Sequence, residues 1–126
     1  MPAYDGSRFD PPAPLAAVTL RNQDNDKTVV AVPMLLDTGA DVTLIPASFL
    51  EPLGLAVDPR ETYELVGFDG RTSTAQGVHL DLIFLERGFR GLFLIINEDC
   101  GILGRDILNH FSVRLDGPQL NWSDLL

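Results

Sequence analysis

Short β-prone runs separated by turn residues occupy most of this chain, and they restrict its fold more than any other feature. Residues 23–26, the Asp69-Gly70 pair, residues 86–88 and the Gly117-Pro118 pair are turn signals that predict hairpins between the runs. One short helix is expected over residues 105–111, where the apolar residues mark a single face. The expected strands are residues 16–21, 27–36, 63–67, 72–85, 92–96, 113–115 and 119–122. This pattern predicts a small all-β domain, closed or sandwiched, with one helix near its end.

Length and charge limit the domain organisation and the partners. Residues 1–14 hold four prolines, so we expect an extended N-terminal arm followed by one compact domain over residues 15–126. There are 18 acidic residues against 9 basic ones, and no basic patch, which argues against a nucleic-acid partner. The longest apolar runs, such as residues 92–96, are too short to cross a membrane. Cys100 is the only cysteine, which favours a reducing, cytoplasmic location.

Residues 35–40 (LLDTGA) are the most informative about function. An apolar run carries Asp37 out of the core, the hydroxyl of Thr38 can orient the carboxylate, and Gly39 permits a sharp backbone reversal. An ordinary Asp-Thr-Gly turn between two strands would show the same local pattern. A second segment, residues 102–106 (ILGRD), follows about 65 residues later, and by itself it reads as an apolar strand leading into a helix.

Together with the Asp-Gly hairpin between them, the two segments resemble the retropepsin family, the single-domain aspartic proteases of retroviruses and their cellular and bacterial relatives. The resemblance covers about residues 15–115 and includes LLDTGAD at 35–41, a glycine-bearing flap hairpin at about 64–77 and ILGRD before a short helix. It implies a small closed acid-protease barrel with a flap hairpin and one short C-terminal helix, active as a two-fold homodimer.

The resemblance also implies roles for individual residues. Asp37 would be the catalytic carboxylate, the Thr38 hydroxyl would brace the loop against a second subunit, and the Gly39 carbonyl would hold the substrate backbone. Asp41 and Arg105 match positions that the family joins in an ion pair near the dimer interface, where the alternative is two ordinary surface charges. The implied substrate-binding residues are Ala40, Asp41, Val66, Gly67, Phe68, Asp69, Gly70, Ile102 and Leu103.

One chain holds one Asp-Thr-Gly, whereas peptide hydrolysis in this family uses two aspartates beside one water. The resemblance therefore implies a homodimer in which Asp37 and its symmetry mate share one proton. The ionised carboxylate takes a proton from the attacking water, and the protonated one donates to the scissile carbonyl oxygen. No cofactor or metal is expected, because His79 and His110 have no ligand partner at a useful spacing. Since proline cannot donate to a sheet, residues 113–122 are a better candidate for the dimer contact than the N-terminal arm.

The leading hypothesis is a homodimeric aspartic endopeptidase that acts on a peptide or protein substrate. An alternative is a dimerising or peptide-binding module that keeps the fold without efficient turnover. This alternative is motivated by the FDGR sequence at residues 68–71, which is more polar than the flap tip of retroviral members. A third idea is self-processing at the proline-rich arm.

Overall fold

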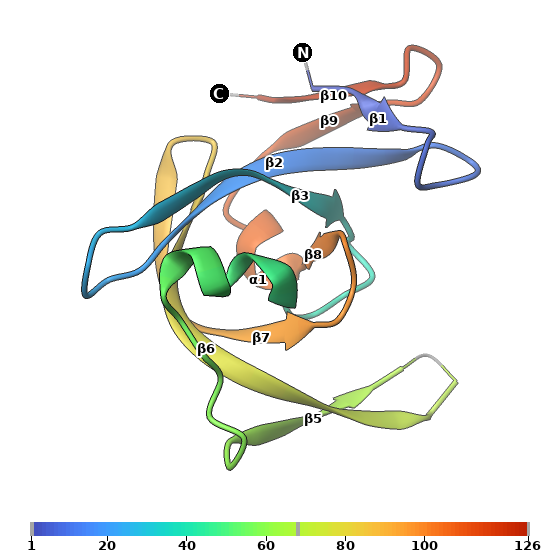
Figure 1. Ribbon diagram of the computed structural model, residues 1–126. Helices are drawn as coiled ribbons and strands as arrows, with labels where there is room; N and C mark the ends of the chain where they lie inside the picture. The colour runs from blue at the N-terminus through green and yellow to red at the C-terminus, as the bar shows by residue number, and fades with distance from the viewer. Residues whose placement is uncertain (1, 68, 126) are drawn as a thin grey trace.

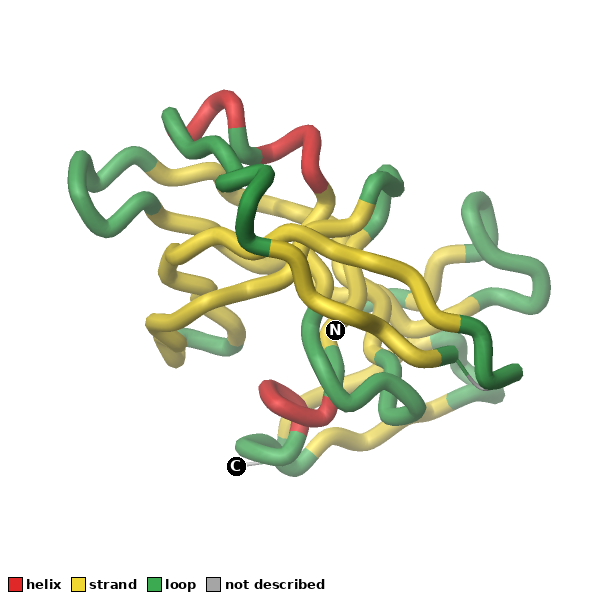
Figure 2. The backbone as a smooth tube through the Cα atoms, turned by 90° about the horizontal axis from the view of Figure 1, so that it is seen from below, coloured by secondary structure: helices red, strands yellow, loops and turns green. Residues whose placement is uncertain are grey.

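The computed structural model describes residues 2–67 and 69–125, and most of its ordered backbone is β-strand (Figures 1 and 2). The strands are β1 Tyr4–Asp5, β2 Ala13–Arg21, β3 Thr28–Leu36, β4 Leu44–Pro46, β5 Thr62–Val66, β6 Thr72–Phe84, β7 Arg87–Ile96, β8 Gly101–Leu103, β9 Val113–Asp116 and β10 Asn121–Asp124. The helical segments are the 3₁₀ turns η1 Ala47–Phe49 and η2 Glu51–Leu53 and the helix α1 Arg105–Leu108. The predicted all-β class is confirmed. None of the described helices is long and apolar enough to cross a membrane.

Six strands close into a barrel in the order β2-β3-β8-β4-β7-β6, because β6 pairs back with β2. β5 pairs with one end of β6 in a hairpin that stands away from the barrel (Figure 1). β9 and β10 form a separate two-stranded sheet at one end of the molecule (Figure 1). η1 and η2 lie on one side of the barrel and α1 on the opposite side (Figures 1 and 2). The predicted closed barrel with a projecting hairpin is therefore confirmed.

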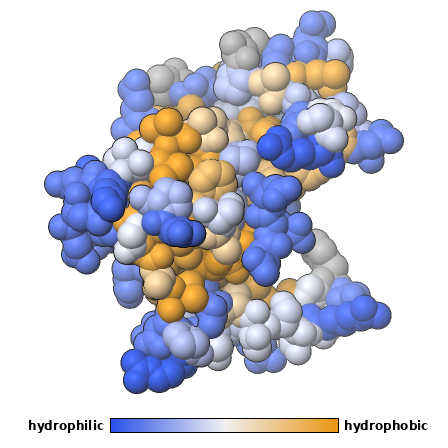
Figure 3. All heavy atoms as spheres, in the orientation of Figure 1, coloured by the Kyte–Doolittle hydropathy of each residue, from blue (hydrophilic) through white to orange (hydrophobic). Residues whose placement is uncertain are grey.

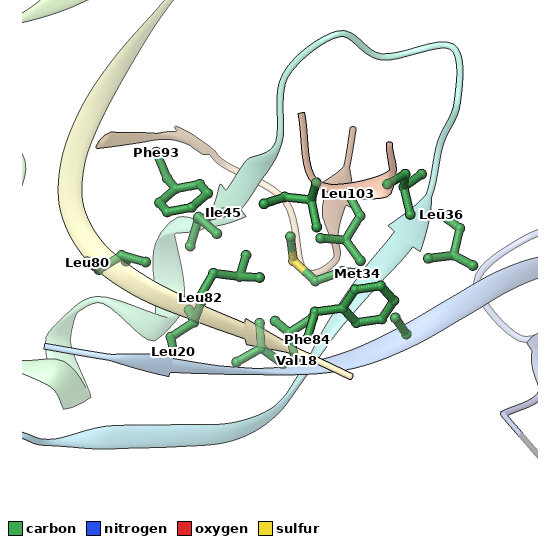
Figure 4. Packing of buried hydrophobic residues seen from close by; sticks show 14 of the residues in the cluster. Val18, Leu20, Met34, Leu36, Ile45, Leu80, Leu82, Phe84, Phe93 and Leu103 are labelled. Carbon is green, nitrogen blue, oxygen red and sulfur yellow. The ribbon is translucent and has the colours of Figure 1, made fainter. Parts of the chain in front are cut away.

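The barrel interior holds the core. Alternate residues of the strands point inward, as on β2, where Ala16, Val18 and Leu20 are buried and Ala17 is exposed. Figure 4 shows the interior side chains converging from several strands. The fully buried apolar residues include Val18, Leu20, Met34, Ile45, Leu80, Leu82 and Leu103. This packing makes the barrel a rigid support for the loops that leave it.

The predicted helix over residues 105–111 is present but shorter, because α1 ends at Leu108. Beyond it, the N–H groups of His110 and Phe111 donate to carbonyl oxygens three residues earlier, each at 3.0 Å. Such bonds tighten the chain into 3₁₀ geometry and end the α-helix. The apolar face still reaches the core, where the Phe111 ring packs edge-on against Phe84 with centroids 5.0 Å apart.

The β6–β7 turn lies earlier than the predicted position at residues 86–88. Phe84 pairs with Arg87, so the turn consists of Leu85 and Glu86, with φ values of 50° and 67°. Positive φ at both central residues gives the twist that hairpin strands need. The usual sequence signal for such a turn is Asn or Gly, and neither is present here.

A cluster of charged residues around the buried Asp81 joins three barrel strands. Asp81 on β6 is 3% exposed and lies opposite Arg21 on β2 and Arg90 on β7. Arg90 Nε donates to Asp81 Oδ1 at 2.9 Å, and Arg21 Nη2 donates to Oδ2 at 2.7 Å. The Arg90 guanidinium, with Arg21 as a second donor, lowers the pKa of Asp81 to about 2 despite the opposing effect of burial.

Because of this cluster, we expect the free energy of unfolding to fall in acid. Because the folded pKa of Asp81 lies below the ordinary value of 3.8, its contribution is complete above about pH 4 and is lost as the pH falls toward about 2. Asp81→Asn is expected to lower the unfolding free energy at pH 7 by roughly 1–3 kcal/mol and to flatten its dependence on pH between 5 and 2. Denaturant unfolding followed by the fluorescence of the single tryptophan measures both effects. Asp24→Asn, at an exposed turn, is the matched control, and parallel pH curves for wild type and Asp81→Asn would contradict the prediction.

The N-terminal residues lie along the last hairpin in this structure. The Tyr4 N–H donates to the Leu120 carbonyl at 2.9 Å, and the Trp122 N–H donates to the Pro2 carbonyl at 3.0 Å. Trp122 is 2% exposed, and its Nε1 donates to the Leu15 carbonyl at 2.9 Å. The hairpin is thus anchored to the barrel by Trp122, while the N-terminal strand covers one of its edges.

Candidate active site

Strand order brings the two informative segments of the sequence together. β8 lies between β3 and β4, pairing parallel with β3 (Leu36 with Leu103) and antiparallel with β4 (Leu44 with Ile102). Residues 37–43, which connect β3 to β4, must therefore pass the end of β8, where the chain leaves for α1 (Figure 1). Asp37 and the start of α1 become neighbours although they are far apart in the chain.

Backbone hydrogen bonds hold Asp37 in a defined orientation. Its N–H donates to the Leu103 carbonyl at 3.0 Å, which continues the β3–β8 pairing by one residue. The Gly39 N–H donates to Asp37 Oδ1 at 2.9 Å, and the Ala40 N–H donates to the Asp37 carbonyl at 3.2 Å. Asp37 is half-buried, whereas Thr38 and Gly39 are exposed. The result is a carboxylate fixed at the surface of a rigid loop.

Arg105 secures this loop from the other segment. Its N–H donates to the Ala40 carbonyl at 2.8 Å, and its Nη1 donates to the Thr38 carbonyl at 2.7 Å. The predicted ion pair with Asp41 is wrong for this structure: no such pair is found among the described residues. The guanidinium instead satisfies a backbone oxygen of the loop, and an exposed pair with Asp41 would add little stability.

Thr43 and Asp106 form a second contact between the two segments, which was not predicted from the sequence. Thr43 is 1% exposed, and its Oγ1 donates to Asp106 Oδ1 at 2.6 Å while its N–H donates to Oδ2 at 3.1 Å. The same Oγ1 accepts the Gly104 N–H at 3.1 Å. A threonine within the apolar stretch after Asp41 was the available signal, because a buried hydroxyl requires a partner.

Gly104 is required where the two segments touch. A Cβ at this position would lie 2.6 Å from the carbonyl carbon and oxygen of Val42 and 3.0 Å from the Ala40 oxygen. These are backbone atoms, which cannot move aside as a flexible side chain would. The close approach of the two backbones is what allows the hydrogen bonds that Arg105 donates to the loop and those that Asp106 accepts from Thr43.

The flap hairpin is present, but its tip differs from the predicted two-residue Asp-Gly turn. The Gly67 N–H donates to the Arg71 carbonyl at 2.9 Å, and the Gly70 N–H donates to the Gly67 carbonyl at 3.0 Å. Gly70 has φ 78°, in the left-handed region. The tip is therefore a wider loop in which the left-handed residue is Gly70. Phe68, a predicted substrate contact, lies outside the described residues.

A pocket of about 340 Å³ lies between the Asp37 loop and the flap. Its lining residues are Asp37, Gly39, Ala40, Asp41, Val42, Leu44, Leu65, Val66, Gly67 and Arg105. The structure thus brings together the predicted contacts Ala40, Asp41, Val66 and Gly67, and places Asp69 and Gly70 at the exposed tip. Val42, Leu44 and Leu65 line the pocket without having been predicted to do so.

The two apolar residues of β8 that were predicted to bind substrate lie in different environments. Leu103 is fully buried in the barrel, so the prediction that its side chain binds substrate is wrong; its carbonyl oxygen positions Asp37 instead. Ile102 is half-buried and lines a neighbouring pocket of about 410 Å³ with Leu35 and Cys100. Alternation along β8 explains the difference, because successive side chains point to opposite faces of a strand. Burial raises the pKa of the Cys100 thiol above its usual range.

The chemistry available at this site is that of a carboxylate. Asp37 lies in a pocket whose other wall is the flap hairpin, an arrangement that leaves room for an extended peptide between loop and flap. Within residues 2–67 and 69–125, no cluster of three or more His, Cys, Asp or Glu side chains is arranged to hold a metal ion.

Comparison with known proteins agrees with this geometry. Residues 25–110, more than half of the chain, match the family described as "gag-polyprotein putative aspartyl protease". The chain belongs to this aspartyl protease family. The matched region contains both segments of the site and the flap hairpin between them. No curated protein shows a significant match to the sequence.

The fold is also that of a retroviral protease. The structure resembles that of EIAV protease, solved in a complex with the inhibitor HBY-793, with a TM-score of 0.56 and 24% sequence identity. The match covers 78% of this chain and 86% of the EIAV chain. The resemblance to retropepsins inferred from the sequence is therefore confirmed by both the family and the fold.

Proposed function

We propose that this aspartyl protease family member is a homodimeric endopeptidase in which Asp37 and Asp37 of a second copy activate one water for peptide hydrolysis. The observation that carries the proposal is the position of Asp37 in a pocket whose other wall is the flap. A half-buried carboxylate, fixed by the Gly39 N–H and facing a projecting hairpin, is arranged for a substrate held between loop and flap. A solvated turn aspartate needs neither feature.

The site geometry suits the shared-proton mechanism. The hydrogen bond from Gly39 holds one carboxylate oxygen, so the orientation of the group is set before substrate binds. With the two carboxylates adjacent across a two-fold axis, one proton is shared between them. The ionised member removes a proton from the water, and the protonated member donates to the carbonyl oxygen as negative charge develops there. The flap adds backbone hydrogen bonds to the extended peptide and excludes water.

The β9–β10 hairpin is the proposed dimer contact. Residues 2–4 already lie along the last hairpin of their own chain, with the Tyr4 N–H bonded to Leu120 and the Pro2 carbonyl to Trp122, so this segment is occupied in cis. Among the described residues β9 pairs with β10 alone, which leaves its other edge open. Leu115 on β9 lies opposite the buried Trp122 and on the same face, yet it is 54% exposed. A second copy at this edge would cover Leu115.

The dependence of activity on concentration tests the proposal. Sedimentation gives the fraction of dimer across a dilution series, and cleavage of a mixed peptide library at acidic to neutral pH gives the specific activity in the same samples. We expect specific activity to rise in proportion to the dimer fraction. Cleavage by a species that remains a monomer would contradict the two-aspartate mechanism. A dimer that binds extended peptides without cutting them would instead identify the protein as a peptide-binding module.

A further inference from the structure

The flap joins the barrel at Gly77 on β6. Residues 72–76 of β6 pair with β5, and Gly77 is the residue at which pairing with β7 begins, opposite Leu94. Among the described strands β5 pairs with β6 alone, so the flap leaves the barrel as a two-stranded ribbon (Figure 1). In the space-filling view, the surface is hollowed where the flap stands away from the body (Figure 3). Because the flap tip is the part of the ribbon furthest from Gly77, a small rotation at this base displaces the tip most.

Two side chains converge on Gly77 from the strands on either side of β6. A Cβ at position 77 would lie 3.1 Å from Cε2 of Tyr63 and 2.9 Å from Cδ1 of Leu92. Tyr63 on β5 pairs with Ala75, and Leu92 on β7 pairs with His79, so each is a diagonal neighbour of Gly77. Both side chains therefore lie against the space that a side chain at position 77 would fill. We call Tyr63, Gly77 and Leu92 the flap clip.

The flap clip links the flap to the barrel through side chains. Because Gly77 has no side chain, the ring of Tyr63 on the flap can reach across β6 toward Leu92 on the barrel. An aromatic ring laid over a glycine of the neighbouring strand supplies packing that the glycine itself lacks. Among the residues that the structure describes, neither Tyr63 nor Leu92 belongs to the buried core or lines the Asp37 pocket. Their contact is therefore not explained by filling the core or by binding a peptide beside Asp37.

We infer that the flap clip fixes the resting position of the flap, which makes Tyr63 a positioning residue that acts on the bound peptide through the flap. The kinetic consequence rests on the proposed peptidase function, whereas the position of the flap does not depend on it. Without the Tyr63 ring, β5 keeps its backbone pairing with β6 but loses its side-chain link to β7. The flap then samples a wider range of positions, and a smaller fraction of molecules holds it where it covers a peptide.

The distance from flap to barrel, measured by pulsed electron paramagnetic resonance, tests the clip directly. Nitroxide labels are attached to Arg71→Cys on the flap and Thr28→Cys on β3, both at exposed positions, in a Cys100→Ser background. An excess of unlabelled protein ensures that only distances within one chain are measured. We expect a narrow distribution for wild-type Tyr63 and for Tyr63→Phe, which keeps the ring carbon Cε2, and a broadened, shifted one for Tyr63→Ala. An unchanged distribution in Tyr63→Ala overturns the inference, whether or not any peptide is cleaved.

Gly77→Ala tests the same contact from β6. The added methyl group must push the Tyr63 ring and the Leu92 side chain aside, so we expect the distance distribution to broaden as in Tyr63→Ala. Gly91→Ala is the matched control, because it is the same change on β7 at a glycine whose Cβ would meet no described atom within 4 Å. Equal broadening in both glycine variants overturns the clip. If Gly77→Ala does not fold, Tyr63→Ala still decides the question, because that side chain lies on the projecting flap.

Peptide cleavage connects the clip with the proposed function. For Tyr63→Ala we expect KM to rise about fivefold, the factor that corresponds to losing one cross-strand side-chain pair, while kcat stays within about twofold. This division is typical of an interaction that supports the bound substrate and the transition state equally. A fall in kcat with KM unchanged overturns the assignment of Tyr63 as a positioning residue for binding. Distances that respond as expected while no protein cleaves any peptide support the clip and remove the peptidase proposal alone.

Discussion

Asp37→Asn is expected to lower kcat/KM for peptide cleavage by at least about 10³-fold, because in the proposed dimer one substitution removes both the acid and the base. The amide can neither take a proton from the water nor donate one as the carboxyl group does. Its carbonyl oxygen can still accept the Gly39 N–H that Asp37 Oδ1 accepts at 2.9 Å, so the loop is expected to keep its conformation. The substitution therefore removes the proton transfer and keeps the loop conformation, because it exchanges only one oxygen for one NH₂ group.

Three measurements check this result. Steady-state kinetics give the loss of activity, sedimentation shows whether the dimer persists, and the fluorescence of Trp122, which is buried against the barrel, reports on the fold. Asp24→Asn, the same change in charge and size at the exposed turn between β2 and β3, is expected to keep full activity. Activity of Asp37→Asn within tenfold of wild type would exclude Asp37 as the catalytic group.

Leu115→Asp is expected to convert the proposed dimer into a monomer and to remove cleavage at ordinary enzyme concentrations. Leu115 lies at the open edge of β9, where a symmetric contact would place it close to Leu115 of the second copy. The substitution replaces apolar contact with two carboxylates of like charge, and such a change at the centre of an interface weakens association strongly. We expect the dimer Kd to rise by about 100-fold or more.

The reason for the loss of cleavage in Leu115→Asp can be identified from the dependence of its specific activity on protein concentration. If Leu115→Asp acts only on association, specific activity recovers as the protein is concentrated and again follows the dimer fraction from sedimentation. Val30→Asp, at an apolar residue of β3 that is also exposed, is the matched control and should change neither mass nor activity. A Leu115→Asp protein that remains dimeric and active places the dimer contact elsewhere on the surface.

The architecture could be predicted from sequence because its signals are local. Alternating apolar residues determine which face of a strand is buried, and turn residues determine where a hairpin forms. The hairpin after Arg21 and the flap between β5 and β6 were therefore found at their correct places. Where a turn lacks its usual residues, as at Leu85 and Glu86, the local signal is absent and the prediction shifts by one or two residues.

The candidate site was predicted less completely, because its contacts join residues far apart in the chain. Arg105 bonds to the Thr38 carbonyl rather than to Asp41, a choice that depends on how two backbones approach each other. Leu103 and Ile102 look alike in sequence, yet strand alternation buries one in the barrel and leaves the other in a pocket wall. The Thr43–Asp106 contact likewise exists only once β8 lies between β3 and β4.

The sequence by itself determined the all-β class, the presence of most of the strands and hairpins, and the family, since each depends on local periodicity or on a short run such as LLDTGA and ILGRD. Only the tertiary structure decided which groups hold Asp37 and which residues line its pocket. Side-chain partners and cavities are set by packing between distant segments, and a pattern of nearest neighbours in the chain does not specify that packing.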